Sequence, residues 1–383
     1  MISRVLEKLV LKQLFTHMNK HSILTSCQHA FRKNHSTETA LLEVTDHVWK
    51  GIDSQQVTTN VLLDLSKAFD KVDHTILMYK LKHYGLYCDW FGSYLAGRSQ
   101  AVRIADETSK FLPTSSGVPQ GSCLGPVLFS IYTNDLPQHL DSKVIMYADD
   151  TQILTSYKTS DQSNAAKQLQ SDLRTVELWM QKNHLSINAG KTQVITFGSN
   201  PQLKKIETNI ASNLHIGGVN PEQLVVVNNL GVKMDSSLSW KEHISQICTK
   251  VNGALIQLAR AKHLISNSDL ISTIKSLALG HLHYCTTVWS VVGKKAAAPI
   301  TRSLRMAERI AGKEFSEYQL ENMVPGKLKH HRNKVDTKTS SVYLNNCLLV
   351  NARGHAIKPR TKTNAGQNQL AFRLVNNKKP TIC

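Results

Sequence analysis

The sequence predicts an α+β fold in which helices cover an antiparallel sheet. Short β-rich stretches, at 57–63 and on both sides of Ala148, alternate with stretches whose apolar residues recur every three or four positions. The chain has 383 residues, of which 41% are hydrophobic, so two or three domains can each bury a core. No run of 18 apolar residues occurs, and we therefore expect no membrane span.

The elements before the middle of the chain follow these patterns in order. Apolar residues at helical spacing predict a helix at the N-terminus, and Ser36 or Thr37 is suited to cap a second helix. Val57–Leu63 is a β-rich, half-apolar strand that ends at Asp64. Further elements are predicted as helices at 74–86, 90–95 and 126–136 and as a strand at 101–104.

Val144–Tyr147 and Thr151–Leu154 predict two strands joined through Ala148, Asp149 and Asp150. The plain interpretation is a hairpin turn, because Asp tolerates the backbone that a turn requires. The alternative is a metal site, because adjacent carboxylates repel each other unless a cation lies between them. Oxygen ligands of this kind favour Mg²⁺ or Mn²⁺.

Asp64 adds a carboxylate at the end of a separate strand, 85 residues before Asp149. It could instead cap the helix that follows. If the two strand ends pair, both side chains can reach one ion, since neighbouring strands lie about 4.8 Å apart. Two metals about 3.5–4 Å apart can bind the attacking and leaving oxygens of a phosphoryl transfer. The glycine-containing loop Ser115–Ser122 either approaches a ligand closely or is an ordinary junction before a helix.

The C-terminal half continues with a long helix, a set of short strands and a helical bundle. The net charge of +18 is uneven, because residues 326–383 alone carry +11. Such an excess suits a polyanion such as nucleic acid, although a generally basic surface is the alternative. The seven cysteines show no CxxC pairing and indicate a reducing compartment. The expected elements are a helix at 163–184, strands at 193–197, 214–216, 224–227 and 230–234, and helices over 241–312.

Taken together, these features resemble the reverse transcriptase of a non-LTR, LINE-like retrotransposon. The Tyr-Ala-Asp-Asp box alone is a weak signal, whereas the matching stretches in order and spacing are specific. They cover about residues 3–312. The matching stretches are Ala30–Ala40, Leu63–His74, Ser116–Pro126, Tyr147–Asp150 and Leu230–Val232 before Trp240.

The resemblance implies a right-hand polymerase with an antiparallel-sheet palm, partial fingers and a helical thumb. The family's endonuclease, most of its first fingers motif and its zinc knuckle have no counterpart in this sequence, so we expect an N-terminally truncated copy. The implied divisions are 1–55 for the partial fingers, 56–212 for the palm with the remaining fingers elements, 213–240 for strands like those of a primer grip, 241–325 for the thumb and 326–383 for a basic, weakly ordered tail.

The resemblance also implies the roles of individual residues. Asp64, Asp149 and Asp150 are the implied catalytic carboxylates. The implied ligands of two Mg²⁺ ions, or of Mn²⁺ in their place, are Asp64, Asp149 and the backbone carbonyl of Leu65. Phe69 matches the position that excludes a ribose 2′-hydroxyl. The other implied contacts are Gln120, Gly121, Arg32 and Lys191 for the nucleotide and Leu230, Gly231 and Val232 for the primer.

The function implied by the resemblance is extension of a DNA primer on an RNA template with dNTPs, as an RNA-directed DNA polymerase. One alternative is a catalytically inactive retrotransposon remnant that binds nucleic acid through its basic surface. Another alternative is a viral-type RNA-dependent RNA polymerase. Phe69 argues against it, because it matches the position that excludes a ribose 2′-hydroxyl. We expect the chain to act inside the cell, in the nucleus and cytoplasm, without secretion or membrane contact.

Overall fold

The computed structural model describes residues 2–86, 88–206, 209–320, 322–323, 349–350 and 356–357. The predicted basic tail at 326–383 therefore lies outside the described residues, apart from two short paired strands. These are β12 (Leu349–Val350) and β13 (Ala356–Ile357).

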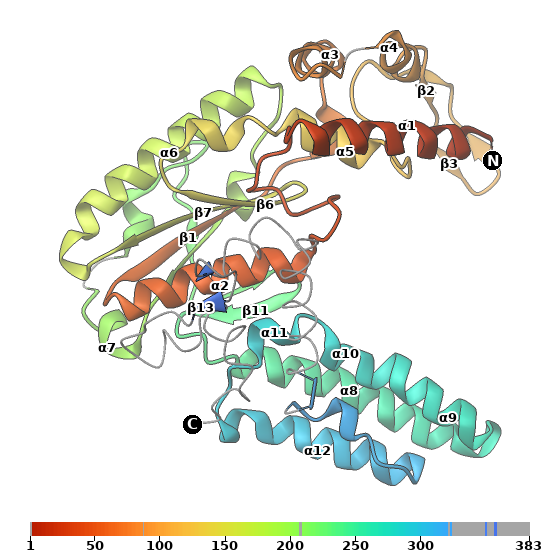
Figure 1. Cartoon of the computed structure of the whole chain (residues 1–383), viewed down its shortest axis with the longest axis vertical. Coiled ribbons are helices and arrows are strands. Elements are labelled where there is room, and N and C mark those ends of the chain that lie inside the picture. Colours follow the sequence, from red (N-terminus) through yellow and green to blue (C-terminus); the bar gives the residue numbers. More distant parts are fainter. Residues whose placement is uncertain are drawn as a thin grey trace.

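A five-stranded sheet in the order β6-β7-β1-β8-β9 forms the centre of the molecule (Figure 1). The central strand β1 (Val57–Leu63) is rich in β-branched residues and pairs antiparallel with β7 (Asp150–Tyr157) and β8 (Gln193–Phe197). β6 (Lys143–Tyr147) pairs antiparallel with β7. Only β9 (Glu222–Gln223) adds in parallel, to β8. The predicted α+β class with an antiparallel sheet is thus confirmed.

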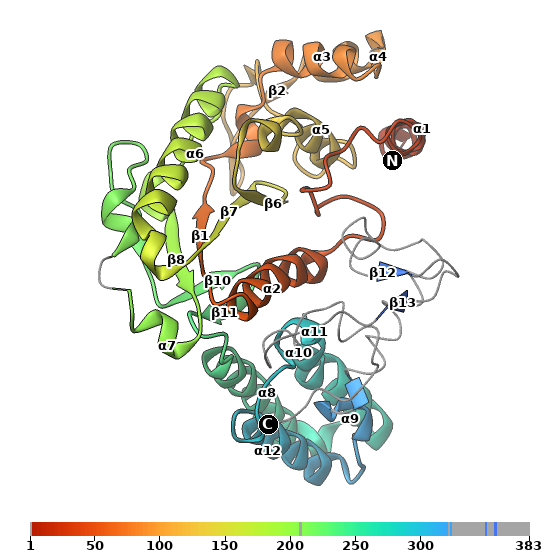
Figure 2. The same cartoon turned by 60° about the vertical axis from the view of Figure 1, so that its left-hand side comes forward.

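Helices cover both faces of this sheet, because side chains alternate between the faces along each strand. One face packs on α2 (Thr37–Asp53), whose start is fixed by the predicted cap Ser36 in a capping box with Thr39. The other face packs on α5 (Gly125–Tyr132) and α6 (Gln162–Lys182) (Figure 2). Residues on the first face include Ile145, Leu154 and Ile195; those on the second include Val144, Ile153 and Val194.

The N-terminal helix α1 (Ile2–Lys20) forms as predicted, but its apolar stripe is only partly used. Leu14 is buried, as is Met18, whereas Val5, Leu6 and Leu9 are exposed. Helices α3 (His74–His83) and α4 (Asp89–Leu95) lie at the same end of the molecule (Figure 1).

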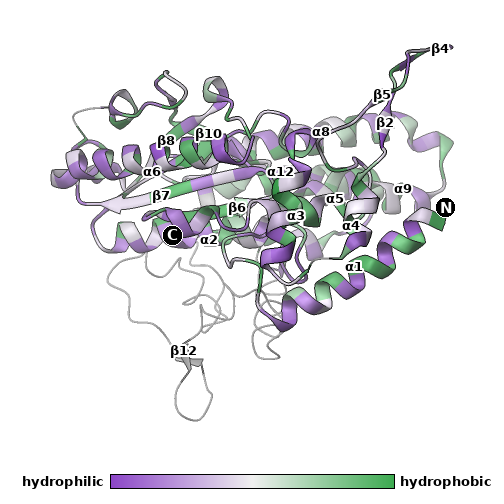
Figure 3. Cartoon of the chain, turned by 90° about the horizontal axis from the view of Figure 1, so that it is seen from above, coloured by the Kyte–Doolittle hydropathy of each residue, from purple (hydrophilic) through white to green (hydrophobic). Residues whose placement is uncertain are grey.

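Two small ribbons project from the body beyond these helices (Figure 3). The predicted strand at 101–104 is therefore wrong in its bounds. Residues 99–100 belong to one ribbon and residues 103–104 to the other. The four strands are β2 (Ser99–Gln100), β3 (Arg103–Ile104), β4 (Glu107–Thr108) and β5 (Leu112–Pro113), paired β2 with β5 and β3 with β4.

A second hairpin leads from the sheet into the C-terminal helices. The predicted strands at 224–227 and 230–234 are shifted, because Leu230 and Gly231 form the turn between β10 (Val226–Asn229) and β11 (Val232–Asp235). The predicted strand at 214–216 is not formed; a 3₁₀ turn, η5 (Ile210–Asn213), precedes one isolated bridge at Ile216.

The helical bundle predicted from residue 241 is confirmed. Its two long helices, α8 (Lys241–Ala261) and α12 (Lys294–Ala311), pack against each other around the fully buried Trp240 and Trp289. The described residues contain no helix that could span a membrane. The other elements are α9 (Asn267–Thr273), the π-helical η7 (Ile274–Leu279), α10 (Gly280–His283), α11 (Thr286–Trp289), α7 (Asn200–Leu203), η2 (Leu136–His139), η3 (Thr159–Asp161), η6 (Lys262–Leu264) and η8 (Ser316–Tyr318).

Candidate active site

The strand register brings three carboxylates to one end of the sheet. Leu63 pairs with Thr151, so the continued register puts Asp64 beside Asp150 and Leu65 beside Asp149. The alternative in which Asp64 caps a helix is wrong. The next helical turn, η1 (Ala68–Lys71), begins after residue 67 and has no side-chain cap.

The backbone around Leu65 is held straight by the segment that follows α6. The amide of Asn188 donates to the Asp64 carbonyl at 2.7 Å, and the amide of Ser66 donates to the Ser186 carbonyl at 2.8 Å. Successive residues of an antiparallel strand direct their backbone groups to opposite sides. The carbonyl of Leu65 therefore points away from Ile187, toward the hairpin that carries Asp149.

Crowding changes the acidity of the two hairpin carboxylates. Burial raises the pKa of Asp149, and the nearby charge of Asp64 raises it further. The pKa of Asp150 is raised to about 6. The largest cause is that the surrounding protein displaces water from the carboxyl, and the charges of Asp149 and Asp64 raise the pKa further. A bound cation would reverse this, because it stabilises the ionised carboxylates.

The donor set fits a divalent ion that prefers oxygen, but it is incomplete by itself. Within the described residues, no three His, Cys, Asp or Glu side chains form a ready metal cage. Magnesium sites that act on phosphates commonly combine one or two carboxylates with water and phosphate oxygens. The oxygen atoms of Asp64, Asp149 and the Leu65 carbonyl are donors of the kind that such a site uses.

The turn that carries Asp149 depends on Ala148 and on Gln28, of which the sequence pattern did not identify the second. Tyr147 pairs with Asp150, so the loop contains only Ala148 and Asp149. Ala148, rather than an Asp, adopts the left-handed backbone with φ 57°, which corrects the prediction that Asp supplies the turn conformation. The buried amide of Gln28 donates to the Ala148 carbonyl at 3.3 Å and accepts from the Ala148 amide at 3.0 Å. No local periodicity marks Gln28.

The loop after β5 is fastened to the segment that follows Asp64. The amides of Gly117 and Val118 donate to the carbonyls of Val72 and Phe69, at 2.8 and 2.9 Å. Gly117 has φ +88°, and a Cβ there would lie 2.9 Å from the carbonyl oxygen of Asp70. The close approach that this glycine permits is thus to the protein's own backbone, not to a ligand.

Phe69 is fixed in place by its neighbours. Its ring stacks on Phe129, with centroids 4.6 Å apart and an interplanar angle of 25°. Gln120 lies near it and donates to Asp70 Oδ1 at 3.0 Å, and Gly121 follows, exposed, with φ +79°. The loop that carries Gln120 and Gly121 is thus attached to the segment that carries Phe69, through Val118 and Asp70.

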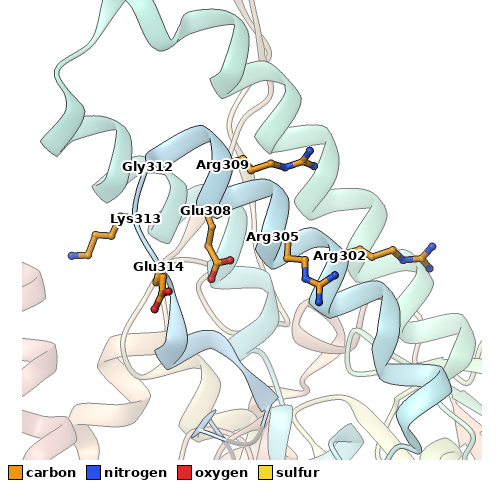
Figure 4. Close-up of a pocket in the computed structure, with 7 residues that line it drawn as sticks. All are labelled: Arg302, Arg305, Glu308, Arg309, Gly312, Lys313 and Glu314. Carbon is orange, nitrogen blue, oxygen red and sulfur yellow. The ribbon is translucent and has the colours of Figure 1, made fainter.

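The surface cavities of the described residues include one beside the Gln120 loop, one beside α1 and one along α12. One of about 580 Å³ is lined by the Gln120 loop and Lys67, and one of about 690 Å³ lies between α1 and Phe31–Lys33. Arg32 lines the latter, but its guanidinium donates to the carbonyls of Thr25 and Gln28, so it also holds its own loop. The third, of about 780 Å³, contains none of the predicted site residues. It lies along α12 and includes Arg302, Arg305 and Arg309 (Figure 4).

The remaining predicted residues lie at two places. Lys191 is exposed at the end of η4 (Ala189–Lys191), three residues after the Asn188 that bonds Asp64. Leu230 and Gly231, with φ 46° and 80°, form the two-residue turn of the β10–β11 hairpin, and Val232 begins β11.

The β10–β11 hairpin is joined to the rest of the molecule on both sides. The hydroxyl of Tyr284 donates to the Leu230 carbonyl at 2.6 Å. The Gln152 amide, two residues after Asp150, donates to Asn229 Oδ1 at 2.9 Å. Sequence reasoning missed Tyr284, because nothing in its local pattern distinguishes it from other residues of the helical region.

The chain combines a helix-covered antiparallel sheet with a cluster of carboxylates at one end of that sheet. The model of the reverse transcriptase (RNA-dependent DNA polymerase) family matches residues 1–234, and the chain belongs to this family. The predicted resemblance to a reverse transcriptase is thereby confirmed.

Curated relatives agree with this assignment. The chain is 27% identical over 301 residues to a probable RNA-directed DNA polymerase from transposon X-element of Drosophila melanogaster, which covers 76% of this chain and 32% of that protein. It is 28% identical over 308 residues to the RNA-directed DNA polymerase from mobile element jockey of the same organism, with the same coverages. The chain thus spans about a third of the length of these relatives.

A solved structure of telomerase from Candida albicans, in complex with a fragment of telomeric RNA, aligns over 85% of this chain and 54% of that chain. The sequence identity is 13% and the TM-score is 0.34, which is too low to decide the fold.

Proposed function

We propose that this chain is an RNA-directed DNA polymerase that extends a DNA primer on an RNA template by two-metal nucleotidyl transfer. The observation that carries the proposal is the convergence of Asp64, Asp149 and Asp150 at one end of the sheet from positions 85 residues apart. Family membership and the net charge of +18, which suits nucleic-acid phosphates, support it.

The three carboxylates have distinct parts in this proposal. Asp64, Asp149 and the Leu65 carbonyl hold two Mg²⁺ ions, for which Mn²⁺ can substitute, and Asp150 lies beside them as the third charge. Bound divalent ions supply charge neutralisation of the attacking and leaving oxygens. The rigid strand ends orient the carboxylates before substrate arrives, which lowers the cost of reorganisation during the reaction.

Phe69 selects deoxynucleotides in this proposal. Its ring is held by Phe129 and by the backbone bond from Val118, so it cannot move aside for an added 2′-hydroxyl. Gln120 and Gly121 contact the incoming nucleotide and the template. Arg32 and Lys191 lie toward the triphosphate, and Leu230, Gly231 and Val232 support the primer end.

The domain divisions expected from the resemblance remain part of the proposal. Residues 56–212 act as the palm with the remaining fingers elements, 1–55 as partial fingers, 213–240 as the primer support and 241–325 as the thumb. The substrates are RNA template, DNA primer and dNTPs, and the site of action is the nucleus and cytoplasm.

Primer extension tests the proposal. The chain is incubated with a heteropolymeric RNA template, a labelled DNA primer, dNTPs and Mg²⁺, beside Asp149→Asn as the matched control. Metal-dependent extension by the wild-type chain alone supports the proposal. Absence of incorporation with RNA binding retained would instead support the inactive, nucleic-acid-binding remnant.

The preference for dNTPs over NTPs distinguishes the proposed function from that of an RNA-dependent RNA polymerase. Wild-type chain should incorporate dNTPs, and Phe69→Val should lower its preference for dNTPs over NTPs by at least about tenfold, because the smaller side chain leaves room for a hydroxyl. Phe69→Tyr keeps the ring and should change the preference little. An unchanged preference in Phe69→Val would contradict the steric-gate assignment.

A further inference from the structure

We propose that Gln28 is a positioning residue for the turn that carries Asp149. This inference rests on the proposed function and deepens it, because it adds a residue that places a metal-binding carboxylate without touching the substrate.

The side chain of Gln28 fits the peptide groups of Ala148. Its Oε1 accepts from the Ala148 amide at 3.0 Å, and its Nε2 donates to the Ala148 carbonyl at 3.3 Å. The same Oε1 accepts from the Ala30 amide at 2.9 Å, and the residue has no exposed surface. One buried amide thus satisfies both backbone groups of the residue that precedes Asp149.

Ala148 needs such support because its backbone is unfavourable. With φ 57° it occupies the left-handed region, which costs a residue with a Cβ about 1–2 kcal/mol. The Gln28 side chain bonds both backbone groups of Ala148 and thereby supports this conformation. Since Asp149 follows directly, any relaxation of Ala148 would rotate the Asp149 carboxylate away from Asp64.

The segment around Gln28 is itself fixed to the sheet edge. The amide of Met146 donates to the Cys27 carbonyl, and the amide of His29 donates to the Met146 carbonyl, both at 2.8 Å. Gln28 therefore bridges in parallel to β6, the strand that leads into the turn. Its carbonyl also accepts from Arg32 at 3.1 Å, so it connects the proposed triphosphate contact to the proposed metal site.

The chain offers a matched control in Asn134. This side chain is also a buried amide with three hydrogen bonds, to the Thr25 amide, the Ile23 carbonyl and the Tyr84 hydroxyl. It anchors the same connecting segment as Gln28, but does not contact the hairpin. Loss of the amide in Gln28→Met and Asn134→Leu should therefore lower the thermal stability of the chain to a similar degree.

The two variants should differ in single-turnover nucleotide addition, measured with saturating template–primer below the unfolding temperature of both. We expect Gln28→Met to be slower than Asn134→Leu by about 100-fold, because misplacement of a reacting group by about 1 Å costs about that factor. Its half-saturating Mg²⁺ concentration should rise several-fold, while its Kd for template–primer stays within about twofold of wild type. Equal rates in the two variants would overturn the inference.

A second variant and a second measurement keep the test independent of folding and of polymerase activity. Gln28→Leu removes both the donor and the acceptor without adding a charge, and should bind Mn²⁺ more weakly than Asn134→Leu, as followed by electron paramagnetic resonance. If wild-type chain binds Mn²⁺ and Gln28→Leu binds it as tightly, the inference fails even where the polymerase is active. If wild-type chain extends no primer but Gln28→Leu weakens Mn²⁺ binding, the proposed function fails and the positioning role stands.

Discussion

Two hairpins in this molecule have turns of the same length and similar backbone geometry, but the pKa values of their aspartates are shifted in opposite directions. The β6–β7 turn (Ala148–Asp149) and the β10–β11 turn (Leu230–Gly231) each have two residues, and each begins with a non-glycine residue at positive φ. Each is held by one distant side chain, Gln28 at 120 residues and Tyr284 at 54 residues. A residue distant in the sequence therefore supports each turn.

The hairpins differ in how the surrounding protein shifts the pKa values of their aspartates. Burial and neighbouring charge raise the pKa values of Asp149 and Asp150. Asp235, at the end of β11, is also buried in part, but hydrogen bonds from Ser237, Ser239 and Trp240 lower its pKa. The fold therefore disfavours the charge of Asp149 and Asp150, which the proposed function requires, whereas it stabilises the charge of Asp235.

The largest effect should come from removal of one charge from the β6–β7 hairpin. Asp149→Asn should reduce primer extension by at least about 1000-fold, because a metal ligand and its charge are lost. Its Tm should be unchanged or higher, because repulsion with Asp64 disappears. Extension assays and thermal unfolding measure the two outcomes, with the exposed Asp106→Asn as the control.

The same substitution on the other hairpin sharpens the comparison. Asp235→Asn should cost about 1–3 kcal/mol of stability, because it weakens charge-assisted bonds to the start of α8. Chemical denaturation measures this cost. If Asp149→Asn destabilised the chain as much as Asp235→Asn does, the β6–β7 carboxylates would be structural and the contrast between the hairpins would be lost.

An intermediate effect is expected where the helical bundle contacts the second turn. Tyr284→Phe removes the hydroxyl that donates to the Leu230 carbonyl, so this turn loses its distant anchor. We expect KM for the template–primer to rise about three- to tenfold with kcat nearly unchanged, in line with one hydrogen bond of about 1 kcal/mol. Steady-state extension measures both, and the exposed Tyr79→Phe is the control. A fall in kcat with KM constant would contradict a role in primer support.

The sequence predicts the first hairpin better than the second. Periodicity locates β1, the strands of the first hairpin and the helices from 241 onward, because regular burial leaves a regular pattern. It misplaces the second hairpin by two residues, since Leu230 is an unusual turn residue. Asp64 and Asp149 stand out through their chemistry, but Gln28 and Tyr284 do not, because tertiary contacts across long separations leave no local signal.

The pH dependence of stability offers a smaller effect of predictable sign. The pKa of Asp150 rises to about 6 on folding, so the folded chain holds its proton more tightly than the unfolded chain. Stability from this group is present at low pH and is lost as pH rises from about 4 to about 6. The Tm of Asp150→Asn relative to wild type should therefore increase over that range.

Asp235 should show the opposite trend, because its pKa falls on folding. Its contribution is present above the unfolded pKa, near about 4, and is lost as pH falls through the lower folded value. The Tm deficit of Asp235→Asn relative to wild type should therefore shrink on acidification. Parallel pH profiles for Asp150→Asn and Asp235→Asn would contradict the distinction between the hairpins.

The smallest effect should come from relief of backbone strain at Leu230. Asn tolerates the left-handed conformation, and Asn-Gly is the preferred pair for a two-residue hairpin turn. Leu230→Asn should therefore change stability by about 0 to +1 kcal/mol, because the lost packing of a half-buried leucine offsets part of the gain. Ala148→Asn should instead destabilise the chain, since Ala148 is buried against Gln28.

Chemical denaturation compares the stability of the two variants, and template–primer affinity is also measured for Leu230→Asn. If that variant is as stable as wild type but binds primer more weakly, the strained leucine serves the primer rather than the fold; unchanged affinity would remove Leu230 from the proposed primer support.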